Sequence, residues 1–347
     1  MSFRLLAVAT AALLSLPTSA ATAPKSVILI IGDGMGVAHF TAARFLAGSN
    51  ARFTKMPVTG LVMTHSADSI VPDSASAATA MATGVKTNNK MVGVDPSGRK
   101  LLTVLEAAEK SGRATGLVTT TNFWDATPAA FAAHAASRRD TAALIPQILS
   151  SGAEIVAGGG ADKLGVAPLP SLEALAREYK YAPIRTAAEL ESVRAQRMLA
   201  VFPTEAREVD SKLVGLPVLA AWAIERLARD PDGFFLLLEH EGPDGSSHGS
   251  ATPELEASLL SLNETINVAL DFAAKNRDVL VLVTGDHETG GLQIHPEKPG
   301  APLELRWSNV GHTGEFVPLF AQGPGAESFT GLLDNTDIGK KLLRFMR

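Results

Sequence analysis

Residues 26–36 read SVILIIGDGMG, an unbroken β-branched and aliphatic run that ends in a glycine-rich turn carrying Asp33. Because the run is apolar at nearly every position, both of its faces must be buried, as in an interior strand of a parallel sheet. Val37 stands where a dinucleotide-binding turn needs its third glycine, so we interpret the glycines as freeing the backbone around Asp33. Asp33 then lies just beyond a strand's carboxyl end, where open parallel sheets bind ligands.

Similar apolar runs recur along the chain and alternate with helical patterns. The expected strands are 115–119, 154–157, 234–238 and 279–283, and the expected helices are 101–110, 125–136, 217–228, 254–274 and 337–346. This alternation predicts an α/β fold, a three-layer sandwich with a mostly parallel central sheet flanked by helices. Residues 291–325 are richer in proline and glycine, so we expect antiparallel or irregular structure there.

Composition limits the class of protein. The chain has 347 residues, 46% of them hydrophobic, no cysteine and a formal charge of −5. These values exclude a disordered or collagen-like chain and lack the basic surplus typical of nucleic-acid binders. We expect residues 24–347 to form a single domain, with a surface insertion within 160–212, where proline, arginine and glutamate mix without a sustained period.

The N-terminus has the pattern of an export signal. A single arginine, an apolar run over 5–16 and small residues after it predict a signal peptide over 1–20, cut after Ala20 or Ala23. No later stretch reaches the roughly 20 apolar residues of a membrane-spanning helix. We therefore expect a periplasmic or secreted protein with neither a membrane nor a nucleic acid as partner.

Polar residues follow other predicted strands as well. Asp286 and His287 come shortly after the run 279–283, and His312 lies between glycines in another polar loop. Asp244 and His248 are four residues apart, so on a helical turn they share one face. Mixed aspartate and histidine sets suit zinc-like ions, so together these residues predict a metal cluster.

Ser74 opens an alanine-rich helix that stops at Gly84. A serine or aspartate at such a position is ordinarily the N-cap of the helix. Small side chains nonetheless leave this helix start open, and a helix N-terminus favours an anion. No Gly-x-Ser-x-Gly elbow surrounds Ser74, so a nucleophilic role requires activation by metal coordination.

The expected helix 125–136 has Thr127 at the cap position and Pro128 in its first turn. Arg138 follows the small-residue run of this helix. Two interpretations of Arg138 stay open. It is either an exposed arginine stabilised by the helix dipole or a residue that grips a phosphate through two nitrogens.

Together these segments resemble the alkaline phosphatase family, and the match extends from about Val27 to the C-terminus. The strings that carry the resemblance are GDGMG (32–36), DSA (73–75), TGVKT (83–87), DATPAA (125–130), SR (137–138), DHETGG (286–291) and HTG (312–314). Their order and spacing are highly specific.

The resemblance implies two Zn²⁺ and one Mg²⁺. The zinc ligands would be aspartates and histidines: Asp244, His248 and His312 at one ion, and Asp33, Asp286 and His287 at the other. The magnesium ligands would be oxygens: Asp33, Thr127, Glu239 and, through water, Asp125. Ser74 would be the nucleophile, and Arg138 would clamp the phosphoryl oxygens.

One passage departs from the family pattern. Between the strand 234–238 and Asp244, Glu239 keeps the expected distance to Asp244, whereas Glu241 keeps the expected glycine neighbour. We choose Glu239 as the magnesium ligand because it directly ends the apolar strand. Gly245 stands where relatives often carry a larger side chain, which leaves the control of the third metal open.

The resemblance implies hydrolysis of phosphate monoesters through a phosphoserine, with release of inorganic phosphate, and a homodimer as the assembly. The nearest alternative is a sister enzyme of the same superfamily that cleaves phosphodiesters, phosphonates or sulfates. An alternative of another class is an exported phosphate- or metal-binding protein without catalysis.

Overall fold

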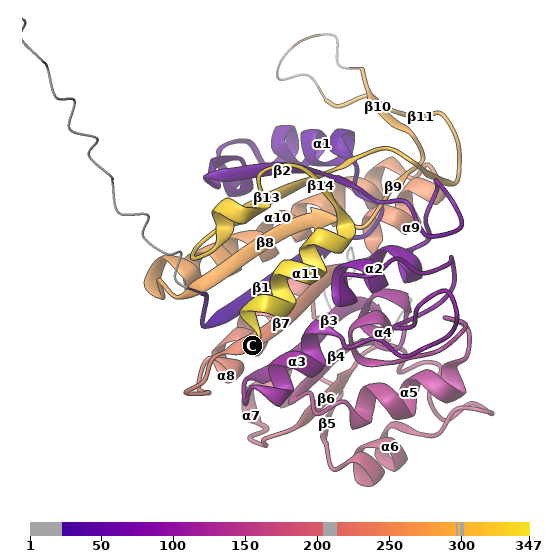
Figure 1. Cartoon of the computed structure of the whole chain (residues 1–347), viewed down its shortest axis with the longest axis vertical. Helices are drawn as coiled ribbons and strands as arrows, with labels where there is room; N and C mark the ends of the chain where they lie inside the picture. Colours follow the sequence, from indigo (N-terminus) through magenta and orange to yellow (C-terminus); the bar gives the residue numbers. More distant parts are fainter. Residues whose placement is uncertain (1–22, 204–213, 296–297, 299–301) are drawn as a thin grey trace, which may run out of the picture.

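The computed structural model describes residues 23–203, 214–295, 298 and 302–347, and it places a central sheet between two helical layers (Figure 1). Ten strands form the sheet, in the order β14 (Gly331–Asp334), β2 (Val58–Met63), β13 (Val317–Gln322), β8 (Val279–Gly285), β1 (Ser26–Gly32), β7 (Phe234–His240), β3 (Ala114–Asn122), β4 (Ile155–Gly159), β6 (Met198–Val201) and β5 (Ala182–Ile184). Only β13 runs antiparallel to its neighbours, β2 and β8. The predicted three-layer, mostly parallel fold is therefore confirmed.

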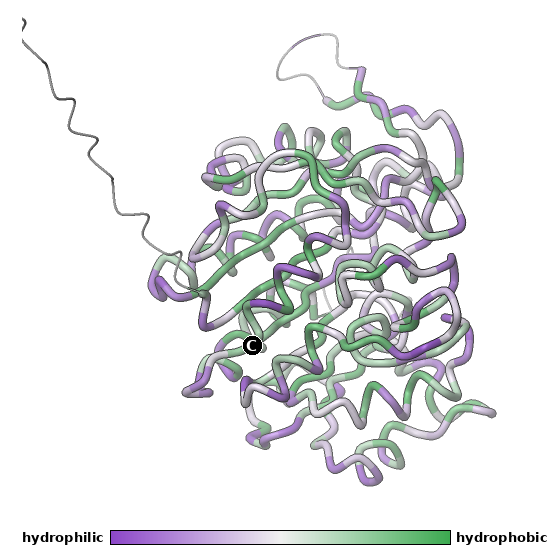
Figure 2. Tube along the Cα trace, viewed as in Figure 1, coloured by the Kyte–Doolittle hydropathy of each residue, from purple (hydrophilic) through white to green (hydrophobic). Residues whose placement is uncertain are grey.

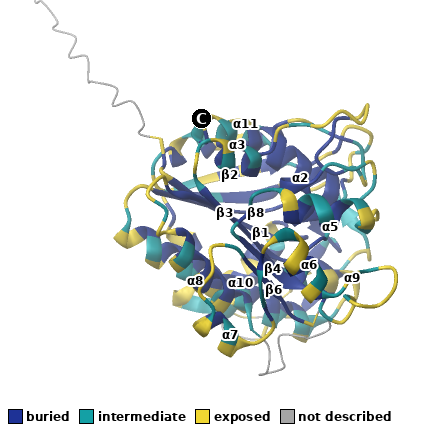
Figure 3. Ribbon diagram, turned by 90° about the horizontal axis from the view of Figure 1, so that it is seen from below, coloured by how far each residue is buried: buried dark blue, intermediate teal, exposed yellow. Residues whose placement is uncertain are grey.

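Each face of the sheet has its own hydrophobic core. Along β1, Val27, Leu29 and Ile31 pack into one core and Ile28 and Ile30 into the other, since successive strand residues point to opposite faces. The helices of the first core are α2 (Ser74–Thr83), α3 (Val104–Lys110), α4 (Ala126–Ala132), α5 (Thr141–Ser150), α6 (Leu172–Tyr179) and α11 (Asn335–Phe345). Those of the second are α1 (Val37–Ala47), α7 (Ala187–Ser192), α8 (Leu216–Leu227) and α10 (Thr252–Lys275). Hydrophobic residues concentrate on the central strands (Figure 2), which are buried between the layers (Figure 3).

Short antiparallel pairs lie between the end of β8 and β13. β9 (Glu288–Thr289) pairs with β12 (His312–Thr313), and β10 (Leu292–Ile294) pairs with β11 (Leu305–Trp307). Together with β13 they confirm the expectation of antiparallel structure within 291–325. Short 3-10 helices cover Gly48–Asn50, Arg52–Lys55 and Ala326–Phe329.

The segment 160–212 is described up to residue 203. It supplies β5 and β6 to one edge of the central sheet, and α6 and α7 pack on opposite faces beside them. This part of the segment extends the main sheet at one edge, and the surface insertion stays a prediction. Its strands have only three and four residues, too few to give a readable alternation.

Two expectations about α4 are corrected. The N-cap is Asp125, whose side chain accepts a hydrogen bond from the Ala126 N–H, whereas Thr127 lies inside the first turn. The helix ends at Ala132 instead of residue 136, because Ala135 leaves it to form an antiparallel bridge with Val92.

Two helices far apart in the sequence, α2 and α11, lie against each other (Figure 1). Gly339 of α11 makes this approach possible, because a Cβ there would lie 2.3 Å from the backbone nitrogen of Gly84 and 2.7 Å from the carbonyl oxygen of Ala80. Every residue of α2 is buried, and all but Met81 are alanine, serine or threonine.

The predicted signal peptide, residues 1–20, lies outside the described residues. Among the helices of the described parts, none has the length and apolarity needed to span a membrane.

Candidate active site

The carboxyl ends of β1, β7 and β8 lie side by side. In the parallel register, Gly32 at the end of β1 is opposite Gly285 of β8 and His240 of β7. The polar residues that follow these strands therefore meet at one edge of the sheet, where ligands bind in this type of fold.

The first set of candidate metal ligands is Asp33, Asp286 and His287. His287 Nε2 lies 3.4 Å from Asp33 Oδ1 and 3.3 Å from Asp286 Oδ2. Both carboxylate oxygens are buried, and neither accepts a hydrogen bond from any residue that the structure describes. The other oxygen of Asp286 accepts hydrogen bonds from the N–H groups of Gly34 and His287, which fixes the carboxylate.

The electrostatics of this set favour a cation. Burial, followed by the charge of Asp286, raises the pKa of Asp33 well above its ordinary value. A divalent cation would offset both effects, because it replaces lost hydration and screens neighbouring carboxylates. Two unpartnered carboxylate oxygens and one imidazole nitrogen are a donor set that fits zinc.

Ser74 lies beside this first set. Its Oγ is 3.3 Å from His287 Nε2, and the side chain is buried. The cap of α2 is Asp73, which accepts a hydrogen bond from the Ser76 N–H, so the hydroxyl of Ser74 is not used to cap the helix. The cap thus leaves that hydroxyl free to react.

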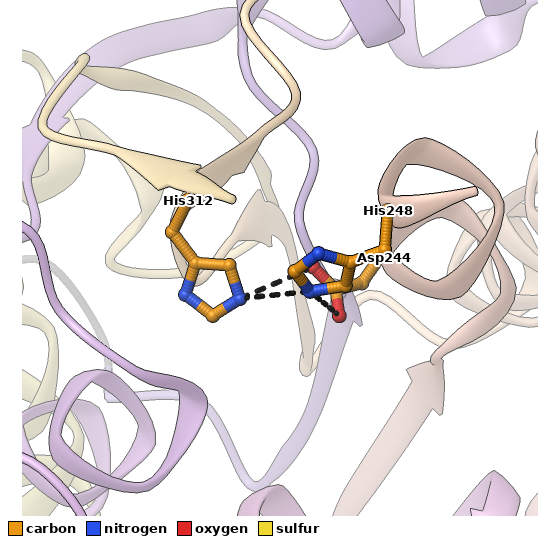
Figure 4. A group of neighbouring side chains, drawn as sticks. All are labelled: Asp244, His248 and His312. Carbon is orange, nitrogen blue, oxygen red and sulfur yellow. Dashed lines mark hydrogen bonds and ion pairs between the residues drawn. The ribbon is translucent and has the colours of Figure 1, made fainter. Parts of the chain in front are cut away.

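The second set is Asp244, His248 and His312 (Figure 4). Asp244 and His248 share one face of the short helix α9 (Gly242–His248), as their spacing predicts. His248 Nε2 lies 3.2 Å from both Asp244 Oδ2 and His312 Nε2. The opposite ring nitrogens contact carbonyl oxygens, Nδ1 of His248 that of Val310 at 2.5 Å and Nδ1 of His312 that of Pro72 at 2.9 Å.

These backbone contacts orient both imidazoles for metal binding. When Nδ1 donates to a carbonyl, the lone pair of Nε2 points to the place where a metal would bind. Hydrogen bonding to Asp244 raises the pKa of His248 to about 9. Although burial opposes ionisation, hydrogen bonding from His248 and the nearby His287 hold the pKa of Asp244 below its usual range.

The two sets adjoin each other. The ring of His287 stacks on that of His312 with 3.6 Å between centroids. Thr289 also links them, since its hydroxyl donates to Asp244 Oδ1 and lies 3.3 Å from His287 Nδ1. Two cations held by these sets would therefore be close neighbours, as in two-metal hydrolytic sites.

A third group of oxygens lies behind the first set. Glu239 is the penultimate residue of β7, is buried, and accepts a hydrogen bond of 2.5 Å from Thr119 Oγ1. Burial raises the pKa of Glu239 to about 8, and the hydroxyls of Thr119 and Thr127 oppose that shift. Asp125 also contributes to the raised pKa, so the group combines two carboxylates with hydroxyls.

Glu241 occupies a different place from Glu239. A Cβ built on Gly245 would lie 3.1 Å from Glu241 Oε1, so the Glu241 side chain occupies the space beside that glycine. Burial, followed by the charge of Asp244, raises the pKa of Glu241 to about 7. The carboxylate of Glu239 thus accepts from the hydroxyl of Thr119, whereas Glu241 contacts the hydroxyl of Thr120 through its backbone N–H.

Arg138 is held between two carboxylates. Its Nη2 lies 3.0 Å from Asp125 Oδ1, and its Nη1 lies 3.4 Å from Asp73 Oδ2. Although burial opposes the charge, Asp125 and then Asp73 keep the pKa of Arg138 above its usual value. Arg138 is not a helix-terminal residue, because α4 ends at Ala132. The structure brings it next to the residue preceding Ser74.

The chain matches the family model described as alkaline phosphatase over residues 24–162 and 210–302. The chain belongs to the alkaline phosphatase family. It is 29% identical to alkaline phosphatase 4 of Bacillus subtilis, with 93% of this chain and 89% of the relative covered. It is 32% identical to alkaline phosphatase H of Pseudomonas aeruginosa, with 90% and 83% covered.

A solved structure supports the same family membership. It is a variant of the alkaline phosphatase from the Antarctic bacterium TAB5, with Mg bound in its M3 site. The TM-score is 0.85 at 28% identity, and 93% of this chain and 98% of that chain are covered. The sequence and structure matches that show the family and the fold thus cover nearly the whole length of this chain.

Sequence reasoning missed three side chains of this family member's site: Asp73, Thr119 and Thr289. Asp73 directly precedes Ser74, so its place next to Arg138 could have been suspected from the sequence. The roles of the two threonines could not be predicted, because their partners Glu239 and Asp244 are distant in sequence.

Proposed function

We propose that this member of the alkaline phosphatase family hydrolyses phosphate monoesters through a phosphoserine at Ser74, with two Zn²⁺ and one Mg²⁺ as cofactors. One observation carries the proposal. Ser74 Oγ lies 3.3 Å from His287 Nε2, the same nitrogen that Asp33 and Asp286 approach with unpartnered oxygens. A hydroxyl among ligands of this kind is poised to become a nucleophile.

The donor atoms match the metals. Asp33, Asp286 and His287 would hold one zinc, and Asp244, His248 and His312 the other. Oxygen ligands from Glu239, Thr127 and Asp33, with Asp125 acting through water, suit the hard Mg²⁺ ion. When bound, these ions supply positive charge that lowers the pKa of the serine hydroxyl and of the departing oxygen.

Ser74 and Arg138 carry the covalent step. The Ser74 oxygen loses its proton and forms a bond to phosphorus while the bond between phosphorus and the ester oxygen breaks. The ester oxygen takes up a proton and leaves as an alcohol, and the phosphoryl group is now on the serine. Water then attacks the phosphoserine, and inorganic phosphate leaves with Ser74 restored. The two guanidinium N–H groups of Arg138 bind the phosphoryl oxygens, and Asp73 and Asp125 hold them in place.

Export and assembly are further parts of the proposal. The predicted signal peptide supports a periplasmic or secreted location, which N-terminal sequencing of the mature protein tests at Ala20 and Ala23. A homodimer is the proposed assembly, and light scattering during size-exclusion chromatography tests it.

Activity and metal content test the function together. The purified protein should cleave p-nitrophenyl phosphate far faster than bis-p-nitrophenyl phosphate. Elemental analysis should find zinc and magnesium, and a chelator should abolish turnover. Faster cleavage of the diester, or of a sulfate or phosphonate ester, would favour a sister enzyme of the superfamily. Phosphate or metal binding without any turnover would favour a non-catalytic binding protein.

A further inference from the structure

Three residues with exposed apolar side chains lie in the loops that contact His248 and His312. They are Ile70, Val71 and Val310, with exposed fractions of 79%, 38% and 68%, and we call them the apolar rim. Single exposed apolar residues are normal on protein surfaces, so their number alone indicates nothing. Their position relative to the catalytic groups carries the inference.

Backbone contacts fix the apolar rim to the imidazoles. The carbonyl of Val310 is bonded to His248, and the carbonyl of Pro72, next to Val71, is bonded to His312. The two loops also touch, since a Cβ added to Gly314 would lie 2.9 Å from Ile70 Cγ2. The rim therefore keeps a constant place beside this set of ligands.

The site opens on the side of the apolar rim. The side chain of His248 is 41% exposed, whereas that of His287, beside Ser74, is fully buried. In an in-line displacement the leaving oxygen departs opposite the attacking oxygen. Ser74 Oγ lies beside His287, whose ring stacks on that of His312. We therefore infer that an organic group leaving on the side away from Ser74 passes these rings toward the exposed His248.

We propose that the apolar rim binds the organic group of the substrate, so that the enzyme favours alkyl and aryl phosphates over polar sugar phosphates. This inference rests on the proposed function. An alkyl chain leaving the site beside His248 would cover Val310 on one side and Ile70 and Val71 on the other. A hydroxylated sugar gains nothing from that contact and keeps its water.

A series of n-alkyl phosphates from propyl to hexyl tests the rim. The leaving alcohols have nearly equal pKa values, so only contact with the protein changes along the series. Complete burial of a methylene favours binding about fourfold, and half-contact with an open rim therefore predicts about a twofold rise in kcat/KM per methylene. The same series of alkylphosphonates, which are not cleaved, should show a parallel fall in inhibition constant.

The double variant Ile70→Ser, Val310→Ser should remove most of this chain-length dependence, so that the ratio of kcat/KM for hexyl phosphate to that for propyl phosphate falls toward one. Val166→Ser is the matched control, because Val166 is 63% exposed in the loop before α6 and has no contact with His248 or His312 among the described residues. The control should keep the full dependence. Thermal unfolding of all three proteins checks that the variants are folded.

A flat series in the wild type would overturn the inference, as would an unchanged slope in the folded double variant. A change of oligomeric state in the double variant, with the slope intact, would make the rim an interface between copies instead. Failure of the proposed function is a separate result, since propyl phosphate would then not be cleaved at all.

Discussion

The assignment of Ser74 as the nucleophile predicts that replacing this residue lowers activity strongly and leaves the stability of the fold almost unchanged. Ser74→Ala removes a hydroxyl with one contact, 3.3 Å from His287 Nε2, and leaves the cap of α2 on Asp73. The lost contact is worth about 1 kcal/mol at most, and alanine returns up to about 0.5 kcal/mol of helix propensity. The free energy of unfolding should therefore change by about 0.5 kcal/mol or less, whereas kcat should fall on the order of 10³-fold or more.

Ser76→Ala is the matched control, two residues along the same buried helix. Ser76 Oγ donates to Asn89 Oδ1 at 2.8 Å and lies 3.0 Å from the carbonyl oxygen of Asp73. Its loss should cost about 1 kcal/mol, seen as a fall in Tm of about 2 °C. Asn89 Oδ1 keeps a hydrogen bond from the Asp73 N–H, so the control should retain most of its activity.

The assay measures p-nitrophenol release and thermal unfolding in the same zinc- and magnesium-containing buffer. Acid quenching during turnover of a radiolabelled phosphate ester should trap label on the wild type and on Ser76→Ala but not on Ser74→Ala. Wild-type turnover by a folded Ser74→Ala variant would refute the assignment. Equal loss of activity in both variants would instead show that the start of α2 matters only as structure.

Other perturbations give independent checks. Arg138→Ala should lower kcat/KM on the order of 10²-fold, because two donors to the phosphoryl group are lost. An unchanged kcat/KM would show that Arg138 only forms structural ion pairs with Asp73 and Asp125. Chelation should lower Tm as well as activity, because metals at 100 times their Kd add about 2.7 kcal/mol to the free energy of unfolding, and identical melting curves with and without chelator would contradict this. Burial raises the pKa of Glu109 to about 7, so the folded state favours its neutral form, and stability should fall as pH rises from the ordinary carboxyl value near 4.5 to 7. Glu109→Gln keeps an acceptor for the Thr115 hydroxyl and should flatten that fall in urea titrations across this pH range; an identical pH dependence would disprove the role of Glu109.

The sequence was most informative where local pattern and burial coincide. β1 and β8 could be predicted because both are apolar at nearly every position, and Asp33 and Asp286 because each directly follows such a strand. The pairing of these strands could not be predicted from either stretch alone, since strand order depends on contacts across the whole chain. The bounds of β13 could not be predicted, although antiparallel structure was expected in its region, because the strand contains Pro318 and the region is rich in proline and glycine.

The roles within the candidate site were harder to predict than its members. Asp125 is both the cap of α4 and the partner of Arg138. The second role could not be predicted, because the sequence predicted a helix up to residue 136, whereas the chain leaves the helix after Ala132 and returns Arg138 to Asp125. Thr289 bridges the two ligand sets through contacts with residues on separate elements, which no spacing in the sequence encodes.

The close packing of α2 and α11 has a consequence for shortened forms of the enzyme. The helix α2, which begins at Ser74, packs against α11, which follows every strand of the sheet in the sequence. Gly339 of α11 lies against Gly84 at the end of α2. A chain without Asn335–Phe345 would expose the alanine-rich helix and leave Ser74 without this support. A nonsense codon or a proteolytic cut just before this helix should therefore abolish phosphatase activity, although every candidate metal ligand precedes it in the sequence.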